Sequence, residues 1–543
     1  MFHTATKSKV FLRISLQSSL GECFLKKKYF SLLICFMACT AAHSQNCNPA
    51  TAYDSLDINN VRARIDNGGD LWRYNQYIVP KSGSGSSLFA GALWIGGLDV
   101  QGNLHVAAQT YRQNGNDFFP GPLDSSGNVT QQTCDDFDRI WKVNKSTVDS
   151  FVAGLFTGTP SSIKEWPGRG NPNLSFLPDQ QLAPFVDANG DGNYNPASGD
   201  YPAIPGDQAL WFVFNDAGNI HGETGGLPLG VEVQCLAYAV KDSSLCTYST
   251  TFYHYLIINK SQNNYDSVFI GFWSDPSSGA SIADYIGSDS ANQLGVIYYA
   301  DEVDTGPVSA IQILKGPTDD AGTVHYLDHS MMYTNDFSIV GNPENAQHYY
   351  QYLQSIWKDG THLTYGDEGF SNSNYVFSSD PSDLNGWSMC TDSLPPADDR
   401  MINSSGPVAI HSGQTKTFDI AVLWDDKSVY PCPSFSVIDS VANCVKNYFD
   451  NIAFISGTEN ISSQQQHLNV FPNPASASSI INFSGKNISR VEIFDLAGKK
   501  LFDSEAGKND AIKLNGDQLG KGLFIYRITL RDHSSQSGKI VVQ

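Results

Sequence analysis

The run LFIYRITL, at Leu523–Leu530, alternates large apolar residues with residues that can face water. Because successive side chains of a β-strand point to opposite sides, every second residue from Phe524 onward falls on one face. Short strands separated by turn residues at regular spacing are typical of a small β-sandwich, which we expect over residues 468–543. Five further apolar runs between turn residues support this expectation, at 468–471, 479–483, 490–494, 511–514 and 539–542.

Four motifs in this region follow each other in a fixed order. They are FPNP at Phe471–Pro474, LAGKKLF at Leu496–Phe502, LGKGLF at Leu519–Phe524 and GKIVVQ at Gly538–Gln543. In order and spacing they resemble the type A C-terminal sorting domain of the type IX secretion system. The positions that carry this predicted sorting signal are Phe471, Pro472, Asn473, Pro474, Gly498, Gly522, Gly538 and Lys539.

The resemblance implies a destination and a set of partners. A protein of this pathway passes through the periplasm and crosses the outer membrane of a Gram-negative bacterium, to be secreted or held on the outer cell surface. Its implied partners are the type IX secretion machinery and a sortase-like protease that removes the domain. Attachment of the remaining chain to surface lipopolysaccharide often follows. The resemblance implies nothing about the task of the residues that precede the domain.

Residues 1–44 have the features of a leader with a signal peptide. Lys26–Lys28 precede the apolar run Tyr29–Ala42, and AlaHisSer at Ala42–Ser44 is a small-x-small cleavage site. The apolar run is too short for a membrane span, so we expect no transmembrane segment. Two alternatives stay open, namely Cys39 as a lipoprotein cysteine and a start codon assigned upstream of the true one.

Charge separates the middle of the chain from both ends. The full sequence has a formal net charge of −21, yet residues 1–44 and 468–543 each carry more basic than acidic residues, so the body between them is strongly acidic. Such a body repels nucleic acid and anionic lipid, which makes both poor partners. The charge changes near the polar stretch 456–467, which we interpret as a linker.

The body is rich in aromatic and β-branched runs, which predict a mainly β, multi-domain protein with β-sandwich-type domains. We expect an N-terminal β-rich region at 45–180, a calcium-binding-type loop at 181–207 and a sandwich-rich region at 208–455. Apolar residues at helical spacing within Ser434–Phe454 predict a helix at the end of the last region. The segment Val61–Trp141 resembles the front of a recurring, uncharacterised group of type IX cargo proteins, which implies no activity.

The clearest chemical motif is DANGDGNYNPASGD, at Asp187–Asp200. Oxygen-bearing side chains alternate along it, and Gly192 at the sixth position permits the sharp turn of a calcium loop. The twelfth position is Ser198 and not Glu, so we assign the closing carboxylate to Asp200. The motif then resembles a dockerin or thrombospondin-type loop and predicts structural calcium, with a solvated turn as the alternative. The predicted ligands are Asp187, Asn189, Asp191, Asn193 and Asp200.

Two other groups are candidates for a cation. Asp275, Asp284 and Asp289 lie at the end of a strand-like run and in the following loop, where a second cation site and a solvated acidic loop are equal alternatives. His325 and His329 could bind a metal together only on a helix, and nothing in the surrounding sequence indicates one. Ordinary surface histidines are therefore the preferred interpretation.

Seven cysteines follow the leader, and in an exported protein they can form disulfides. Cys235 is close enough in sequence to Cys246 to be its partner. The same holds for Cys432 and Cys444, although the sequence does not fix the connectivity. Because the number is odd, at least one thiol stays unpaired.

The body contains no nucleophile elbow, P-loop, zinc-protease or dinucleotide motif. Paired carboxylates of the glycosidase type leave no motif, so a secreted hydrolase acting on polysaccharide or protein remains an alternative. We expect a non-catalytic, calcium-stabilised protein that binds or adheres to an unidentified glycan or protein ligand. A structural component of the cell envelope is a third hypothesis.

Overall fold

The computed structural model describes two parts, residues 47–451 (the body) and residues 469–542 (the C-terminal domain). The predicted leader, the linker 456–467, and Pro472–Pro474 and Gly498 of the predicted sorting signal lie outside the described residues. Short gaps interrupt both parts, at 84, 278–283, 301–304, 368, 472–474, 477, 485–487, 496–498, 506–510 and 532–534.

The first large sheet of the body has nine antiparallel strands. Its centre is formed by β5, β14 and β19, which come from distant parts of the chain and pair along most of their lengths. The order is β1 (Tyr53–Leu56), β2 (Arg62–Asp66), β3 (Asp70–Leu71), β5 (Ser86–Asp99), β14 (Tyr265–Pro276), β19 (Asp399–Ile410) and β18 (His329–Thr334), with β4 (Tyr77–Ile78) paired to β2 and β5, and β6 (Leu104–Ala108) to β5.

The second large sheet also has nine antiparallel strands. Its longest strands, β17 and β20, pair with each other, and β20 continues the sheet to β13. The order is β15 (Asp284–Asp289), β16 (Leu294–Tyr299), β17 (Thr305–Lys315), β20 (Thr415–Val429), β13 (Thr251–Asn259), β12 (Val231–Ala239), β11 (Gln208–Asn215) and β7 (Phe119–Pro120), with β8 (Trp141–Asn144) paired to β11.

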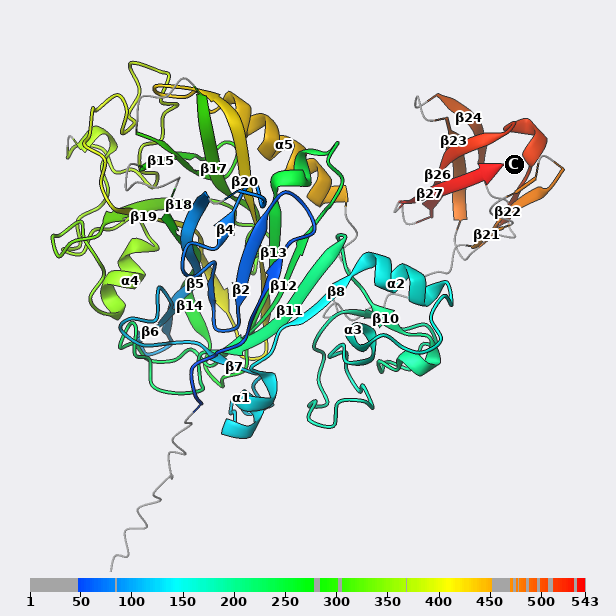
Figure 1. Ribbon diagram of the computed structural model, residues 1–543, viewed down its shortest axis with the longest axis horizontal. Coiled ribbons are helices and arrows are strands. Elements are labelled where there is room, and N and C mark those ends of the chain that lie inside the picture. Colours follow the sequence, from blue (N-terminus) through cyan, green and yellow to red (C-terminus); the bar gives the residue numbers. More distant parts are fainter. Residues whose placement is uncertain are drawn as a thin grey trace, which may run out of the picture. The chain divides into compact units, whose positions relative to one another are not determined.

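The two sheets pack on one continuous core. Trp72, directly after β3, reaches the second sheet, where its Nε1 donates a 2.9 Å hydrogen bond to Tyr253 Oη. The outer faces are covered as well, because α4 (Ala346–Tyr352) contacts β5 and β6 while α5 (Ser436–Asn451) contacts β17 and β20 (Figure 1). Of the strands in the second sheet, β11 and β12 are buried at every position and so have no wet side.

Helix α5 confirms the helix that apolar spacing predicts within Ser434–Phe454. It begins and ends within two or three residues of the predicted limits, and its apolar face lies on the second sheet. The buried residues recur every three or four positions, at Ile438, Ala442, Val445 and Phe449.

The body has three disulfides, Cys47–Cys134, Cys246–Cys444 and Cys390–Cys432. The sequence-based pairing of Cys235 with Cys246 is wrong because Cys235 lies inside β12, fully buried in the core, and is free. Cys246 starts the short 3-10 helix η2 (Cys246–Ser249), which contacts α5 and so faces Cys444. The sequence-based pairing of Cys432 with Cys444 is also wrong, because Cys432 pairs with Cys390 and Cys444 with Cys246.

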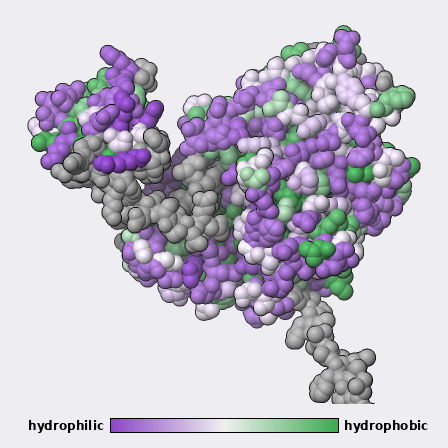
Figure 2. Space-filling model, turned by 180° about the vertical axis from the view of Figure 1, so that it is seen from behind, coloured by the Kyte–Doolittle hydropathy of each residue, from purple (hydrophilic) through white to green (hydrophobic). Residues whose placement is uncertain are grey.

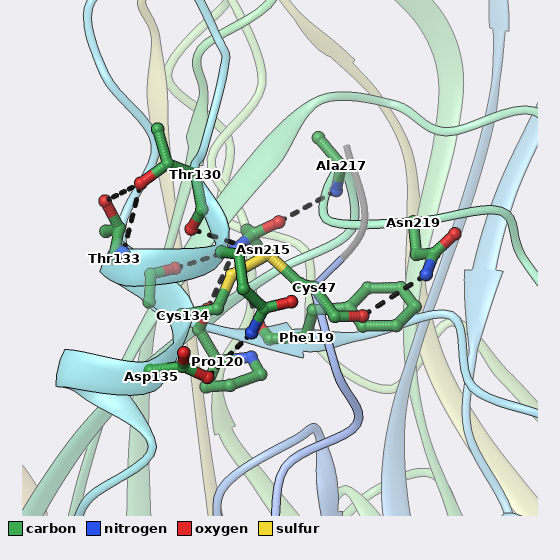
Figure 3. Close-up of a disulfide and its surroundings, with 12 residues drawn as sticks. Cys47, Phe119, Pro120, Thr130, Thr133, Cys134, Asp135, Asn215, Ala217 and Asn219 are labelled. Atoms are coloured by element: carbon green, nitrogen blue, oxygen red, sulfur yellow. Dashed lines mark hydrogen bonds between the residues drawn. A yellow bond between two sulfur atoms is a disulfide. The ribbon is translucent and has the colours of Figure 1, made fainter. Parts of the chain in front are cut away.

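Cys47–Cys134 fixes the start of the body to α1 (Gln131–Phe137), as Figure 3 shows. The backbone N–H of Cys47 donates to Gly218 O at 2.9 Å, and Asn219 Nδ2 donates to Cys47 O at 3.2 Å. Thr130 caps α1 by accepting a hydrogen bond from the N–H of Thr133. Cys47, near the end of the predicted leader, is thus bound covalently and by hydrogen bonds to the body.

The predicted regions 45–180 and 208–455 both contribute strands to the two large sheets. In the first sheet β5 pairs with β14, and in the second β8 pairs with β11. The segment between β8 and β11 forms a small β-ribbon and short helices. These elements, with one more in a later loop, are α2 (Lys145–Val152), α3 (Ser161–Lys164), β9 (Phe185–Val186), η1 (Pro196–Ser198), β10 (Tyr201–Pro202) and η3 (Tyr365–Asp367).

The C-terminal domain has a separate core between a three-stranded and a four-stranded sheet. This arrangement confirms the small β-sandwich predicted from the alternating runs. Among the described residues of the whole chain, no helix is long and apolar enough to cross a membrane. The strands are β21 (Asn469–Phe471), β22 (Ile480–Ser484) and β25 (Ala511–Asn515) in one sheet, and β24 (Lys500–Glu505), β23 (Ile488–Phe494), β26 (Gly522–Leu530) and β27 (Ser535–Val542) in the other, with η4 (Gly516–Gln518) between β25 and β26.

Candidate functional site

A recess of about 350 Å³ opens at one end of the first large sheet. It lies where β14 and β18 end and β19 begins, beside the start of β5. These strands are antiparallel neighbours, so residues from four distant segments meet at this end of the sheet. We call this recess the Arg400 cavity. Its aromatic and charged lining residues are Phe89, Tyr111, Asp275, Asp284, Asp398, Asp399 and Arg400.

Arg400 is the centre of the hydrogen-bond network in this cavity. Its Nε donates to Tyr111 Oη at 2.6 Å, and its Nη1 donates to Asp398 Oδ1 at 2.5 Å. Nη1 also lies 3.4 Å from Asp275 Oδ1, in an ion pair whose two side chains are almost completely buried. Burial is the largest single influence and acts to lower the pKa of Arg400, but Asp275, Tyr111 and the hydrogen bond to Asp398 together raise the pKa above its ordinary value.

Asp275 is a carboxyl group that titrates near neutral pH. Burial raises its pKa to about 7, against the opposing effects of Arg400 and of the hydrogen bond from Tyr111. Tyr111 Oη donates that bond to Asp275 Oδ2 at 2.5 Å. Burial, with the nearby charge of Asp275, also raises the pKa of Tyr111, so the phenol stays protonated.

The two aspartates at the start of β19 have different environments. Burial alone would raise the pKa of Asp398, but hydrogen bonds from Arg400 and Asn335 lower it below the ordinary value. Burial raises the pKa of Asp399 to about 6, although Thr334 Oγ1 donates to its Oδ1 at 2.7 Å. Asp399 Oδ2 is buried, and within the part of the chain that the structure describes it has no hydrogen-bond partner.

Aromatic rings support one side of the Arg400 cavity. Phe89 contacts Tyr111 edge to face at 5.8 Å and remains 37% exposed. Tyr111 contacts Trp273 edge to face at 5.2 Å, and Trp273 stacks on Trp94 at 6.2 Å. This aromatic layer holds Tyr111 in place and leaves one face of Phe89 accessible.

The sequence identified only part of this site. Asp275 and Asp284 do line one cavity, but Asp289 does not line it. It lies at the far end of β15 and accepts a 2.8 Å hydrogen bond from the N–H of Ala291. The three aspartates therefore do not form one site, because Asp284 and Asp289 lie at opposite ends of β15. The run DDR at Asp398–Arg400 was the one local signal that could have pointed to the rest of the network.

His325 and His329, for which ordinary surface histidines are the preferred interpretation, do not lie on a helix. His325 Nδ1 lies 2.9 Å from Asp328 Oδ2, whereas His329 is part of β18, a strand and not a helix. Burial lowers the pKa of His329 to about 4. Across the described residues, no three His, Cys, Asp or Glu side chains converge as they would around a metal ion.

The predicted calcium loop is a tight turn built around Asp187. Its Oδ1 accepts the N–H of Gly190 and its Oδ2 the N–H of Gly192, both at 2.7 Å. Asp191 Oδ1 accepts the N–H of Asn193 at 2.8 Å. Hydrogen bonds from that N–H and from the Asn189 side chain lower the pKa of Asp191, so it stays ionised. An ionised carboxylate has further lone pairs that these bonds do not use.

Asp200 has a different position from the other four predicted ligands. It is fully buried, and its Oδ1 and Oδ2 accept the N–H groups of Ala188 and Asn195 at 2.8 and 2.7 Å. Asn189, in contrast, is exposed and donates to Asp191 Oδ2 at 2.8 Å. Asp200 therefore connects both ends of the loop from inside, while the other predicted ligands lie on its outer part.

The described residues of the predicted sorting signal lie on strands of the C-terminal domain. Phe471 ends β21, Gly522 begins β26, and Lys539 is exposed on β27. Gly538 pairs with Tyr526 across β26 and β27. A Cβ at Gly538 would lie 2.4 Å from Tyr526 Oη, so the tyrosine ring occupies the space that any larger residue would need.

Comparison with known families identifies the C-terminal domain. Residues 469–543 match the family described as a secretion system C-terminal sorting domain. The chain therefore carries a type IX sorting domain, which interacts with the secretion machinery, and it is exported to the cell surface or secreted. No curated protein sequence matches the chain.

Two solved structures align with the chain at 5% sequence identity. One is a polysaccharide lyase, aligned over 67% of this chain and 40% of its own length with a TM-score of 0.19. The other is the adhesin domain of Epf from Streptococcus pyogenes, aligned over 54% of this chain and 80% of its own length with a TM-score of 0.12. The chain thus spans less than half of the lyase, and at these scores neither likeness carries a conclusion.

Proposed function

We propose that this exported protein binds a carbohydrate on the cell surface or in the medium, with the ligand in the Arg400 cavity. The observation that carries the proposal is the combination, in one recess, of a partly exposed ring, Phe89, with several carboxyl and amide groups. Small-ligand sites have this composition, in which an apolar wall buries the ligand and a few polar groups orient it.

A sugar suits both sides of the recess. Its C–H face can lie on the ring of Phe89, and its hydroxyl groups can donate to carboxylates and exchange hydrogen bonds with the amides of Gln113 and Asn335. A protein partner needs a wider contact, of about 1,000 Å² or more. On the face in Figure 2, hydrophobic residues occur in small groups among hydrophilic ones.

The test is a binding measurement on the full chain with a panel of methyl glycosides and short oligosaccharides. Phe89→Ala should weaken binding at least tenfold because it removes the accessible ring. Phe370→Ala is the matched control, since this phenylalanine is 92% exposed and lies outside the cavity lining. Unchanged binding by Phe89→Ala, or an equal loss in both variants, would contradict the proposal.

We also propose that calcium stabilises the loop 187–200. The support is the set of exposed oxygen side chains on one turn and the spare lone pairs of the ionised Asp191. At a calcium concentration 100 times the dissociation constant, binding would stabilise the fold by about 2.7 kcal/mol. Asp200 would then position the loop ends, as its two hydrogen bonds to backbone N–H groups indicate.

Thermal unfolding in calcium and in chelator tests this proposal. Asp191→Asn should remove most of the rise in melting temperature that calcium gives, while melting in chelator stays unchanged. The control is Asp124→Asn, because Asp124 is likewise an aspartate of an exposed turn, and its Oδ1 accepts backbone N–H groups at 2.8 and 2.9 Å. A calcium effect that survives in Asp191→Asn would assign the ion to another place.

A hydrolase is the second candidate, and one observation favours it. Asp275 and Asp398 both contact Arg400 Nη1, yet burial raises the pKa of the first to about 7 while hydrogen bonds lower that of the second. Environments that separate two carboxyl groups in this way are typical of acid and base pairs. Release of reducing sugar by the wild type, abolished in Asp275→Asn, would support this candidate over simple binding.

The sorting domain supports two further proposals about partners. A sortase-like protease would remove the C-terminal domain, and surface lipopolysaccharide would receive the remaining chain. Mass spectrometry of the protein recovered from the cell surface tests both, because cleavage within the stretch 452–468 would leave a body without the sorting domain. An intact chain on the surface would contradict removal.

A further inference from the structure

The charged lining of the Arg400 cavity is unbalanced. Among the lining residues, four carry a carboxyl group and one carries a basic group. Charge of one sign in a recess with low-dielectric walls attracts ligands of the opposite sign. A ligand that brings a positive charge would therefore complement the lining, whereas a neutral sugar would leave the imbalance unchanged.

The one basic group is not available to a ligand. Arg400 is 6% exposed, and its Nε donates to Tyr111 at 2.6 Å. Its Nη1 donates to Asp398 Oδ1 at 2.5 Å and to the Asp398 carbonyl at 3.0 Å, while Nη2 donates to Asp398 Oδ2 at 3.3 Å. An anionic ligand, such as a uronate or a sulfated sugar, would have to break these bonds to reach the guanidinium.

Asp399, in contrast, has a carboxyl oxygen that can accept a hydrogen bond from a ligand. Asp399 is 4% exposed, Thr334 occupies its Oδ1, and its Oδ2 lacks a hydrogen-bond partner among the residues that the structure describes. A buried polar atom without a partner destabilises a protein by about 1–3 kcal/mol. A ligand that donates a hydrogen bond to this lining residue would remove that penalty, and a charged donor would do so more strongly.

An organic cation fits the cavity better than a metal ion does. No three His, Cys, Asp or Glu side chains converge in the described part of the chain, so the aspartates of this cavity are not arranged around one point. An ammonium group distributes three N–H donors over separate acceptors. The rings of Phe89 and Tyr111 favour a cation beside them as well, through the negative face of the aromatic system.

We propose that the Arg400 cavity recognises a sugar with a free primary ammonium group, whose charge lies against the carboxyl groups of Asp398 and Asp399. This inference rests on the carbohydrate-binding function proposed above and adds the charge of the ligand. The common chemistry is the ammonium group, which an amino sugar or a free aliphatic diamine could supply.

Calorimetric titration of the full chain with four probes separates these cases. The probes are methyl glucosaminide, methyl N-acetylglucosaminide, methyl glucoside and cadaverine. At pH 7 the glucosaminide should bind at least tenfold more tightly than its N-acetyl derivative and the glucoside. Its affinity should fall at pH 5, where the carboxyl groups of Asp275 and Asp399, with pKa values of about 7 and 6, are protonated.

Each other result has a defined meaning. Equal binding of glucosaminide and glucoside would overturn the ammonium inference and leave the carbohydrate-binding function standing. Tight binding of cadaverine without any glycoside would support recognition of the ammonium group and overturn the carbohydrate-binding function. Absence of binding for all four probes would overturn both.

A matched pair of variants tests the assigned residue. Asp399→Asn keeps the shape and an oxygen for Thr334 but removes the charge, so it should weaken the glucosaminide at least tenfold and leave the glucoside unchanged. Asp336→Asn is the control, because Asp336 is an exposed aspartate nearby that accepts hydrogen bonds from Ser338 and does not line the cavity. An equal effect of both variants would overturn the assignment, and thermal unfolding would show whether each variant is folded.

Discussion

The body and the C-terminal domain are both made of antiparallel sheets, but they bury their strands differently. In the body, β11 and β12 are buried at every position, because the core lies on one side and helices or loops lie on the other. In the C-terminal domain, β23 and β24 alternate between more and less buried residues. Strands of the domain thus have one face that is more buried than the other, whereas β11 and β12 of the body are buried on both faces.

The two parts also differ in what stabilises them. The body has three disulfides and a core of aromatic side chains that joins both sheets. The C-terminal domain contains no cysteine and has a small core, with ion pairs such as Arg490–Asp503 on its surface. Covalent cross-links therefore stabilise the body, whereas the C-terminal domain, which carries the sorting signal, depends on its own small core.

Deletion of residues 469–543 should have the largest effect on the molecule, and only on its destination. The truncated chain should accumulate in the periplasm because the sorting domain is absent, yet its body should unfold at the same temperature since its core is separate. Cell fractionation and calorimetry measure the two results. Normal surface delivery would contradict the separation of roles.

Loss of the Cys246–Cys444 disulfide should destabilise the body alone. The bond closes a loop with a sequence separation of 198, and the chain-entropy argument gives about 5 kcal/mol for a loop of this size. Cys246→Ser with Cys444→Ser should lower the calorimetric transition of the body and leave that of the C-terminal domain unchanged. A parallel shift of both transitions would show that the two parts unfold together.

Raising the pH from 5 to 8 should weaken the body by about 1–3 kcal/mol. Burial raises the pKa values of Asp275 and Glu223 to about 7, so both stay protonated in the folded state while the unfolded chain ionises above pH 4. Their contribution is therefore present in acid and is lost as the pH rises to about 7. Unfolding by denaturant at several pH values should show this decline, reduced in Asp275→Asn.

The C-terminal domain should lose stability only in strong acid and not as the pH rises from 5 to 8. Hydrogen bonds from Arg490 and Lys500 lower the pKa of Asp503, so its contribution is present above pH 4 and is lost only in stronger acid. Between pH 5 and 8 the stability of this domain should stay constant in the same experiment. If the stability of the C-terminal domain declined as much as that of the body, this would contradict the prediction, which depends on exposed charges in the domain and buried carboxyl groups in the body.

Gly538→Ala should have the smallest effect, confined to the C-terminal domain. The added Cβ would meet the end of the Tyr526 ring at 2.4 Å, and because this ring is partly exposed it can move aside. We expect a loss of about 1–2 kcal/mol. Gly158→Ala is the control in the body, since no atom lies within 4 Å of its added Cβ.

The sequence by itself determined the class of the protein and its export. Alternating runs predict strands wherever one face of a sheet is wet, so LFIYRITL at Leu523–Leu530 indicated the C-terminal sandwich correctly. Helical spacing indicated α5 for the same reason, because it too has one buried face. The continuous apolar runs of β11 and β12 predicted strands, but such runs do not reveal which neighbours cover each face.

Only the tertiary structure decided the disulfides and the Arg400 cavity. Cys246 and Cys444 meet because η2 and α5 lie together on one sheet, a contact that sequence distance conceals. The cavity combines Asp275 and Arg400 because β14 and β19 are neighbours at one end of the first large sheet, and Tyr111, from the segment after β6, hydrogen-bonds to both. Local patterns record the burial of one strand, whereas a site of this kind depends on which distant strands pair and in which register.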